Sequence, residues 1–218
     1  MTIYGAAVLV VIVFFINSRF LEESFSFFGL KGGHLKRTNT NSMKILGKGF
    51  FEKTALKIAP DLLGKYLVRR IGKKTMRFMI TDVEIYNGPW DKASHARFGL
   101  TKRNAPMFEQ GGVWYVYFTY GMHWMLNIVT GRKSYPSAIL IRGVEGINGP
   151  ARITKKLKIN KKLNNKIASP KVGLWIENNS KIKSQKSKLQ FKIKKLPRVG
   201  VNYAGPVWSK KKWRFLTF

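Results

Sequence analysis

The 218-residue sequence contains no cysteine and only 10 acidic residues. The lack of cysteine excludes disulfide bonds, zinc sites built from thiolates and a thiol nucleophile. The three histidines, His34, His95 and His123, form no HxxxH or HxH pair, so we expect no metal site. Neither a GxxxxGK[ST] loop nor a GxGxxG loop is present, so we expect no ATP, NAD or other cofactor.

The charge balance is strongly basic. Lys and Arg number 41, which gives a formal net charge of +31. Such a charge favours a polyanionic partner, nucleic acid first and an anionic membrane second, although a genomic base bias that enriches Lys, Ile and Asn would also raise it. The bias is strongest in residues 151–218, where Glu177 is the one acid. We expect the lysine-rich stretch 181–195 to form part of a phosphate-binding surface.

The first 42 residues differ from the rest of the chain. An apolar run extends from Ile3 to Ile16 and is shorter than the ~20 residues that a membrane span usually needs. No basic residue precedes it and no small-residue cleavage site follows it, so it is a poor signal peptide. Two interpretations stay open: a short membrane anchor that makes membrane contact, or an extension outside a functional protein that begins at Met43. We therefore divide the chain into an extension with a linker, 1–42, and a single domain, 43–218.

Hydrophobic periodicity in the domain predicts a mixed α+β fold. One helix, or two short ones interrupted by Pro60, is expected within 52–66, and another within 149–159 with Pro150 in its first turn. The predicted strands cover 66–71, 77–86, 113–131 as a pair, 137–147, 172–178, 198–203 and 213–218. Their irregular order predicts one domain with a curved, mainly antiparallel sheet flanked by short helices.

Glu84 stands in the apolar strand pattern of ITDVEIY. A carboxylate placed there costs free energy unless it is paired or takes part in chemistry. The pattern alone allows either a structural ion pair with a basic residue such as Arg142, or a general base that activates water.

Aromatic residues cluster close to this strand. Alternation along 114–119 places Tyr115, Tyr117 and Thr119 on one side and apolar residues on the other. Phenol rings beside a basic surface are suited to stacking on bases, and Tyr120 lies at a predicted turn from which its ring could project. Asn127, like Arg142, is a polar residue within an apolar run and needs a partner if it is buried.

Seven blocks resemble, in order and spacing, the alkyladenine (3-methyladenine) DNA glycosylase family. The resemblance runs from about Phe50 to Phe218, and the blocks are DLLGKYLVRR, TDVEIYNGPWDKASHARFG, TKRNAPMF, YVYFTYGMHWMLNIV, ILIRGVE, GPARITKKLKI and RVGVNYAGPVWSKKKWRF. It implies one mixed domain around a curved antiparallel sheet. It also implies a monofunctional DNA glycosylase of base excision repair, which flips alkylated or deaminated purines out of double-stranded DNA and hydrolyses their glycosidic bond without a cofactor.

The resemblance also implies a role for each matching position. Glu84 is expected to deprotonate the attacking water, with Arg142 holding both the water and Glu84. In the base pocket, Asn127 is expected to exclude normal guanine. The implied walls of the pocket are Tyr86, His95 and Tyr117. The implied wedge into the duplex is Tyr120, with Met122 beside it.

The family pattern further favours a monomer in the cytoplasm, associated with the nucleoid. Two alternatives stay open. The first is a non-catalytic basic nucleic-acid-binding module with the same fold. The second is a membrane-tethered protein that uses its lysines against anionic lipid.

Overall fold

A computed structural model describes residues 44–180 and 192–218. The predicted extension 1–42, the proposed start at Met43 and most of the lysine-rich stretch 181–195 lie outside these ranges. The domain boundary and the membrane anchor therefore stay predictions. Within the ranges that the model covers, no helix is long and apolar enough to cross a bilayer.

The described part of the chain contains one open, antiparallel sheet of nine strands. The strands are β1 (Tyr66–Ile71), β2 (Lys74–Asn87), β3 (Trp114–Thr119), β4 (His123–Val129), β5 (Ser137–Val144), β6 (Ile147–Asn148), β7 (Leu174–Glu177), β8 (Ile193–Leu196) and β9 (Arg214–Thr217). Their main order is β3-β4-β5-β2-β1-β7. Strand β6 pairs with β5, and the β8–β9 hairpin joins the sheet through β2.

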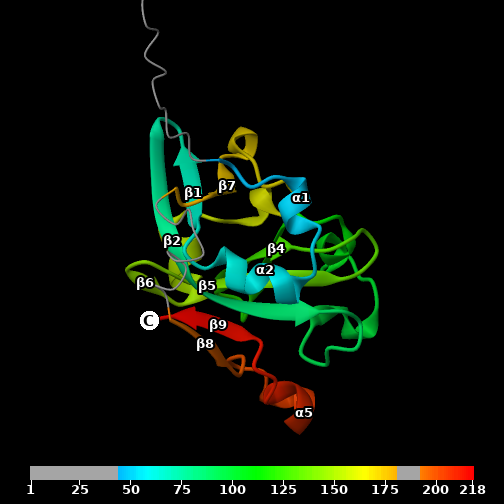
Figure 1. The fold of residues 1–218 in the computed structure, drawn as a ribbon. Helices are drawn as coiled ribbons and strands as arrows, with labels where there is room; N and C mark the ends of the chain where they lie inside the picture. The colour runs from blue at the N-terminus through cyan, green and yellow to red at the C-terminus, as the bar shows by residue number, and fades with distance from the viewer. Residues whose placement is uncertain (1–43, 181–191) are drawn as a thin grey trace, which may run out of the picture. The chain divides into compact units, whose positions relative to one another are not determined.

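The long strand β2 gives the sheet its curvature (Figure 1). Its first half pairs with β1, whereas its second half pairs with β5 on one side and β9 on the other. The register shifts between Ile80 and Val83, where β2 passes from one group of strands to the other. Such bulges bend a strand and increase its twist, so β2 changes direction at this point.

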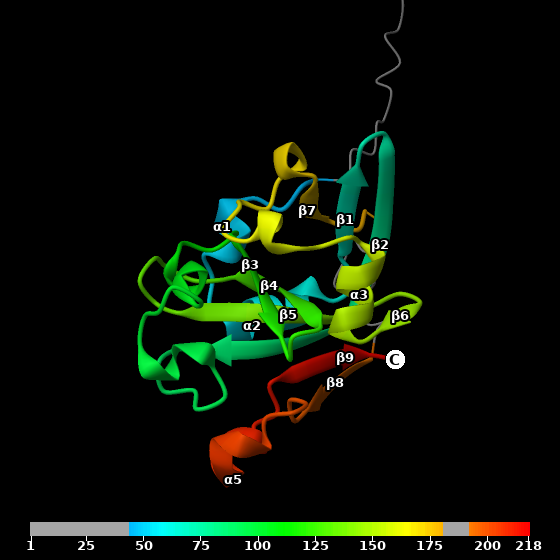
Figure 2. The same cartoon turned by 180° about the vertical axis from the view of Figure 1, so that it is seen from behind.

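Short helices pack around the sheet (Figure 2). The α-helices are α1 (Lys48–Phe51), α2 (Ala55–Leu62), α3 (Pro150–Lys156) and α5 (Gly205–Ser209). Residues 44–180 and 192–218 also contain five 3₁₀ turns: η1 (His95–Phe98), η2 (Ala105–Phe108), η3 (Lys161–Leu163), η4 (Pro170–Val172) and η5 (Asn202–Ala204). Helix α2 contacts β2 and β5, and α3 contacts β4 and β5.

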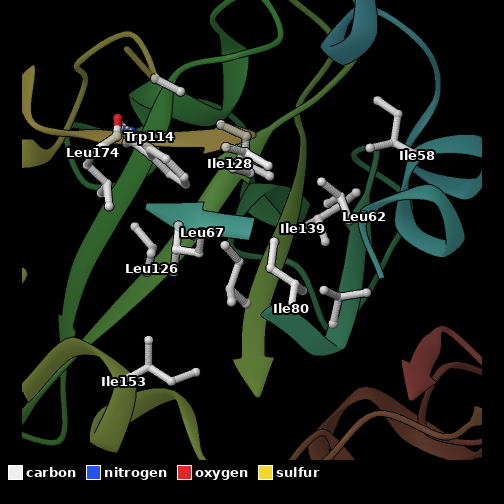
Figure 3. Close-up of a cluster of buried hydrophobic side chains, with 14 of the residues drawn as sticks. Ile58, Leu62, Leu67, Ile80, Trp114, Leu126, Ile128, Ile139, Ile153 and Leu174 are labelled. Atoms are coloured by element: carbon white, nitrogen blue, oxygen red, sulfur yellow. Dashed lines mark hydrogen bonds between the residues drawn. The ribbon is translucent and has the colours of Figure 1, made fainter. Parts of the chain in front are cut away.

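The main core lies on one face of the sheet, beneath α2 and α3 (Figure 3). Alternate residues of each strand point into it, as a period of two requires. The sheet residues on this face include Val83, Ile85, Trp114, Val116, Leu126, Ile128, Ile139 and Ile141. The residues between them point to the opposite face, where a smaller cluster around Tyr115 and Met107 packs.

The predicted fold class is confirmed: the chain is α+β with a mainly antiparallel sheet. Among the elements, the 66–71 and 77–86 hairpin, the 113–131 pair and the helix starting at Pro150 are present. A single helix, α2, occupies the 52–66 region and contains Pro60, so the suggestion of two helices there is wrong.

The late strands are confirmed in part. Strands β7 and β9 lie where they were predicted, but 198–203 is not a strand. Gly200 has a φ of +75°, and the Val199 N–H bonds to a side chain instead of a neighbouring strand. Strand β8 was not predicted, because its lysines hide the alternation of apolar and polar residues that indicates a strand. Lysine is a common protection for an edge strand, which is what β8 is.

Candidate active site

The face opposite the main core carries a cavity of about 270 Å³. Small-ligand pockets commonly measure ~300–1,000 Å³, so the cavity suits one small ring system. Its walls come from β2, β3, β4 and β5, from the segment that leads into η1, and from residues 199–203 before α5.

One row of paired residues crosses four strands under this cavity. Glu84 on β2 pairs with Leu140 on β5, Leu140 pairs with Asn127 on β4, and Asn127 pairs with Tyr115 on β3. All four border the cavity. Paired residues in adjacent strands present their side chains on the same face. The strand register therefore brings Glu84 and Asn127 to the same cavity, although they are 43 positions apart in the sequence.

Glu84 is fully buried at the edge of the cavity. Its Oε2 accepts a hydrogen bond from the Tyr86 hydroxyl at 3.1 Å, and its Oε1 accepts one from the Val199 N–H at 2.9 Å. Burial raises the pKa of Glu84, while nearby Arg142 and the two hydrogen bonds oppose that shift. The carboxylate is thus a stronger base than an exposed glutamate, and Arg142 and the two hydrogen bonds favour its anionic form.

Arg142 lies between two carboxylates. Its Nε is 3.5 Å from Glu84 Oε1 and 3.7 Å from Asp82 Oδ2. Arg214 on β9 makes a closer, two-pronged contact with Asp82, with distances of 2.7 and 3.0 Å. Because Arg214 occupies Asp82, Arg142 is left to face Glu84 and the cavity. The ion pair expected between Glu84 and Arg142 is present, and it does not exclude a catalytic role.

His95 lies at the rim of the cavity against two tyrosines. Its Nδ1 is 2.9 Å from the Tyr115 hydroxyl, and its ring meets the Tyr117 ring edge-on at 4.7 Å between centroids. His95 is partly exposed at the rim. The partial burial of its ring against the two tyrosines, together with the charges of Arg103 and Arg97, lowers its pKa to about 4. The imidazole is therefore neutral at physiological pH.

Asn127 is buried at the base of the cavity. Its Nδ2 donates to the Tyr115 carbonyl at 3.1 Å, which fixes the orientation of the amide. An oriented amide presents a fixed hydrogen-bonding edge to a bound ring and selects among rings by their exocyclic groups.

Tyr120 stands at the tip of the turn between β3 and β4. It is 82% exposed and has a φ of +52°, and Gly121 after it has a φ of +64°. The Met122 N–H donates to the Thr119 carbonyl at 3.1 Å and closes a four-residue turn around these two residues. Positive φ at both central positions is what a type I′ turn needs, but it is unusual for a bulky residue. Met122 beside it is 67% exposed and does not border the cavity, whereas Tyr120 does.

The structure places seven of the eight predicted site residues around one cavity, with Met122 next to it. Their chemical roles stay predictions. Prediction from sequence missed the Val199 N–H, the Asp82–Arg214 contact, Tyr115 and Tyr203. It also missed a buried ion pair between Arg198 and Asp91. Alternation did place Tyr115 on the side of Tyr117, but no sequence signal identifies a backbone donor 115 residues from its acceptor.

Comparison with known proteins identifies the family. The family model described as methylpurine-DNA glycosylase matches residues 49–148 and 144–217. This chain belongs to that family. The predicted family and enzyme class, a DNA glycosylase that hydrolyses N-glycosyl bonds, are therefore confirmed.

Similar curated proteins come from distant organisms. A protein of Legionella pneumophila (strain Corby) is 37% identical over 180 residues, covering 79% of this chain and 94% of its own. One from Borreliella burgdorferi (strain ZS7) is 39% identical over 178 residues, covering 76% and 92%. One from Methanocella arvoryzae is 35% identical over 193 residues, covering 79% and 92%. Each carries the name "Putative 3-methyladenine DNA glycosylase".

Proposed function

We propose that the protein is a monofunctional DNA glycosylase that excises alkylated or deaminated purines from double-stranded DNA after flipping them into the cavity. The observation that carries this proposal is the buried carboxylate of Glu84 at the edge of a cavity walled by Tyr86, His95 and Tyr117. A base inside the duplex cannot reach such a site, so it must leave the stack.

Glu84 is the general base in this mechanism. It takes a proton from a water molecule held beside Arg142, and the water oxygen forms a bond to C1′. The C1′–N bond breaks, and its electron pair goes to the departing base. The products are a free base and an abasic site. None of the residues that the structure places around the cavity is a lysine, so we propose no Schiff-base step and no strand cleavage.

The electrostatics of the walls support alkylated purines as substrates. An N-alkylated purine carries positive charge on the ring and leaves as a neutral base. Electron-rich faces of Tyr86 and Tyr117 attract a cation, and the anionic Glu84 lies at the same cavity. A protonated His95 would repel such a base, but its pKa of about 4 keeps it neutral.

Tyr120 is the wedge that fills the gap in the duplex, with Met122 beside it. A strained, exposed aromatic at a tight turn costs stability without a packing benefit, which is typical of a functional site. Asn127 selects against normal guanine. The high net charge of +31 supplies sequence-independent affinity for phosphates in a monomer that searches along DNA.

Base release from a duplex with one hypoxanthine tests this function. We expect alkali-labile breaks at the lesion with the wild-type protein and none with Glu84→Gln, which should still bind the duplex. Tight, salt-sensitive binding by the wild-type protein without base release from hypoxanthine or methylated purines would instead support the non-catalytic module.

A further inference from the structure

The segment after β8 supplies part of the active site without belonging to the sheet. Residues 198–201 run between β8 and η5 and reach the end of β2 (Figure 1, orange). Val199 donates its N–H to Glu84, and Val199, Gly200 and Val201 border the cavity. Because no strand pairing holds this segment, something else must fix its position.

Arg198 is the residue that anchors it. The side chain is fully buried, and its two terminal nitrogens contact both oxygens of Asp91 at 2.6 and 2.9 Å. One of them also donates to the Ile85 carbonyl on β2 at 2.8 Å, and the other donates to the Trp208 carbonyl at 3.3 Å. A planar guanidinium is suited to such a forked contact, and lysine is not.

Asp91 anchors the loop between β2 and η1. It accepts hydrogen bonds from the backbone N–H groups of Asn87, at 3.2 Å, and Ala93, at 3.0 Å. These residues flank the loop that leads from β2 to His95. The ion pair therefore joins three pieces of chain: the end of β2, the loop before His95 and the segment that carries Val199.

Arg198 also touches the second hydrogen-bond donor of Glu84. Its guanidinium lies 5.0 Å from the centre of the Tyr86 ring, within the range of a cation–π contact. The Tyr86 hydroxyl donates to Glu84. Arg198 thus adjoins both donors to the Glu84 carboxylate. It is bonded to Val199 in the chain, and its guanidinium lies over the ring of Tyr86.

This arrangement carries a cost in stability. Replacement of a buried ion pair by a well-packed apolar pair is often neutral or stabilising. Moreover, Arg198 Nε is the one buried side-chain nitrogen or oxygen, among the residues that the structure describes, with no hydrogen-bond partner. Burial of an unsatisfied donor calls for a reason other than stability.

We propose that Arg198 and Asp91 are positioning residues for Glu84, which hold the Val199 N–H and the Tyr86 hydroxyl against its carboxylate. This inference rests on the proposed function of Glu84 as general base. Neither residue touches the reacting atoms. Their loss frees the 198–201 segment, removes hydrogen bonds that favour the anion, and so raises the pKa of Glu84.

The other charged and titratable groups around Glu84 come from four strands. Besides Tyr86, which Arg198 contacts, they are Asp82 on β2, Arg142 on β5 and Arg214 on β9, with Tyr117 on β3 across the cavity. Arg142 and Arg214 are held by Asp82 and do not contact Asp91. A change in the pH profile of the variant therefore reports on the Val199 and Tyr86 hydrogen bonds.

The test compares single-turnover base release across pH for the full-length wild-type protein and the double variant Asp91→Asn/Arg198→Gln, which removes both buried charges together. We expect the rate at neutral pH to fall about 10- to 100-fold, since small displacements of a catalytic group have such effects. We also expect the acidic limb of the profile to move to higher pH, with unchanged affinity for lesion duplex. Arg198→Lys should restore the rate only in part.

The matched control is Arg77→Gln/Glu177→Gln. This pair also joins a buried carboxylate to an arginine, at 3.1 Å, but it lies on β2 and β7 away from the cavity. It should lower stability without moving the acidic limb. Replacing the Val199 residue by its α-hydroxy acid removes the N–H alone and should reproduce the shift, even if the double variant does not fold.

The outcomes separate the two proposals. An unmoved acidic limb in the folded double variant, or in the Val199 ester, would overturn the positioning role. Absence of base release by the wild-type protein in the same assay would overturn the proposed function itself.

Discussion

The Arg142 Nε lies 3.5 Å from Glu84 Oε1, on the neighbouring antiparallel strand. The distance is longer than a strong charged hydrogen bond, and the close donors to Glu84 are neutral: the Val199 N–H and the Tyr86 hydroxyl. Arg142 therefore favours the ionised form of Glu84 through its charge without binding it tightly. A carboxylate held in this way can still accept a proton from water.

Replacement of Glu84 by glutamine should remove the general base and preserve the shape of the cavity. We expect the single-turnover rate to fall by about 10²- to 10⁴-fold, the usual contribution of a positioned base. Glu177→Gln is the matched control, because Glu177 is also a buried glutamate that pairs with an arginine, outside the cavity. Equal rates for the two variants would contradict the role of Glu84.

The rate of base release should depend on pH through Glu84. Burial raises the pKa of this carboxyl above its ordinary value, and only the deprotonated form is a base. Activity should therefore be present at neutral pH and be lost on acidification, at a higher pH than an exposed glutamate would give. A rate profile from pH 4 to 8 measures it, and a rate independent of pH over that range would be inconsistent with a titrating base.

The titration of His95 should add no step near pH 6.5 to the pH profile of the rate. Its pKa is lowered to about 4 because burial and two nearby arginines disfavour the imidazolium. We expect its ring resonances to titrate with a midpoint near pH 4 in an NMR series, assigned by their loss in His95→Asn. Since the folded state then binds fewer protons than the unfolded state between pH 6.5 and 4, His95 also lowers stability as the pH falls through that window. A midpoint near 6.5 would contradict the lowered pKa and the surroundings that explain it.

Tyr120 should be needed for catalysis on duplex DNA and not for stability. In a left-handed conformation a non-glycine residue costs about 1–2 kcal/mol, and asparagine tolerates it better. Tyr120→Asn should therefore keep or raise the melting temperature, while the affinity for lesion duplex and the rate fall. Tyr135→Asn, at another exposed tyrosine that does not border the cavity, serves as the control. Full activity of Tyr120→Asn would exclude the wedge.

Asn127 should control the discrimination between guanine and hypoxanthine, and not only the rate of base release. In Asn127→Ser the hydrogen bond to the Tyr115 carbonyl is lost, at a cost of about 1 kcal/mol, and space opens at the base of the cavity. We expect the ratio of guanine to hypoxanthine release to rise, and the ratio cancels any general loss of activity. Release of both bases quantified by mass spectrometry measures it; an unchanged ratio means that another residue excludes guanine.

Much of the site follows from local sequence rules. The period of two puts Glu84 and Tyr86 on one face of β2 and their apolar neighbours on the other, and the Tyr120-Gly121 turn fixes the β3–β4 hairpin. The row from Glu84 to Tyr115 also needs the strand order and register, which no single strand pattern contains.

The long-range parts of the site could not be predicted. The valines of RVGVNY alternate as in a strand, but a buried arginine at position 198 and positive φ at Gly200 keep the segment out of the sheet. The partner of Arg198 is 107 residues away. Local propensity says nothing about such a pair, because tertiary contacts and not neighbours in sequence determine it.

The identity of the product tests the central claim most directly. DNA treated with dimethyl sulfate is incubated with the full-length protein, and the soluble fraction and the DNA are analysed separately. The proposed mechanism predicts free 3-methyladenine in solution and abasic sites in strands that stay intact until alkali is added. Release of no free purine, or strand breaks that appear with the base and without alkali, would contradict a monofunctional hydrolysis driven by Glu84.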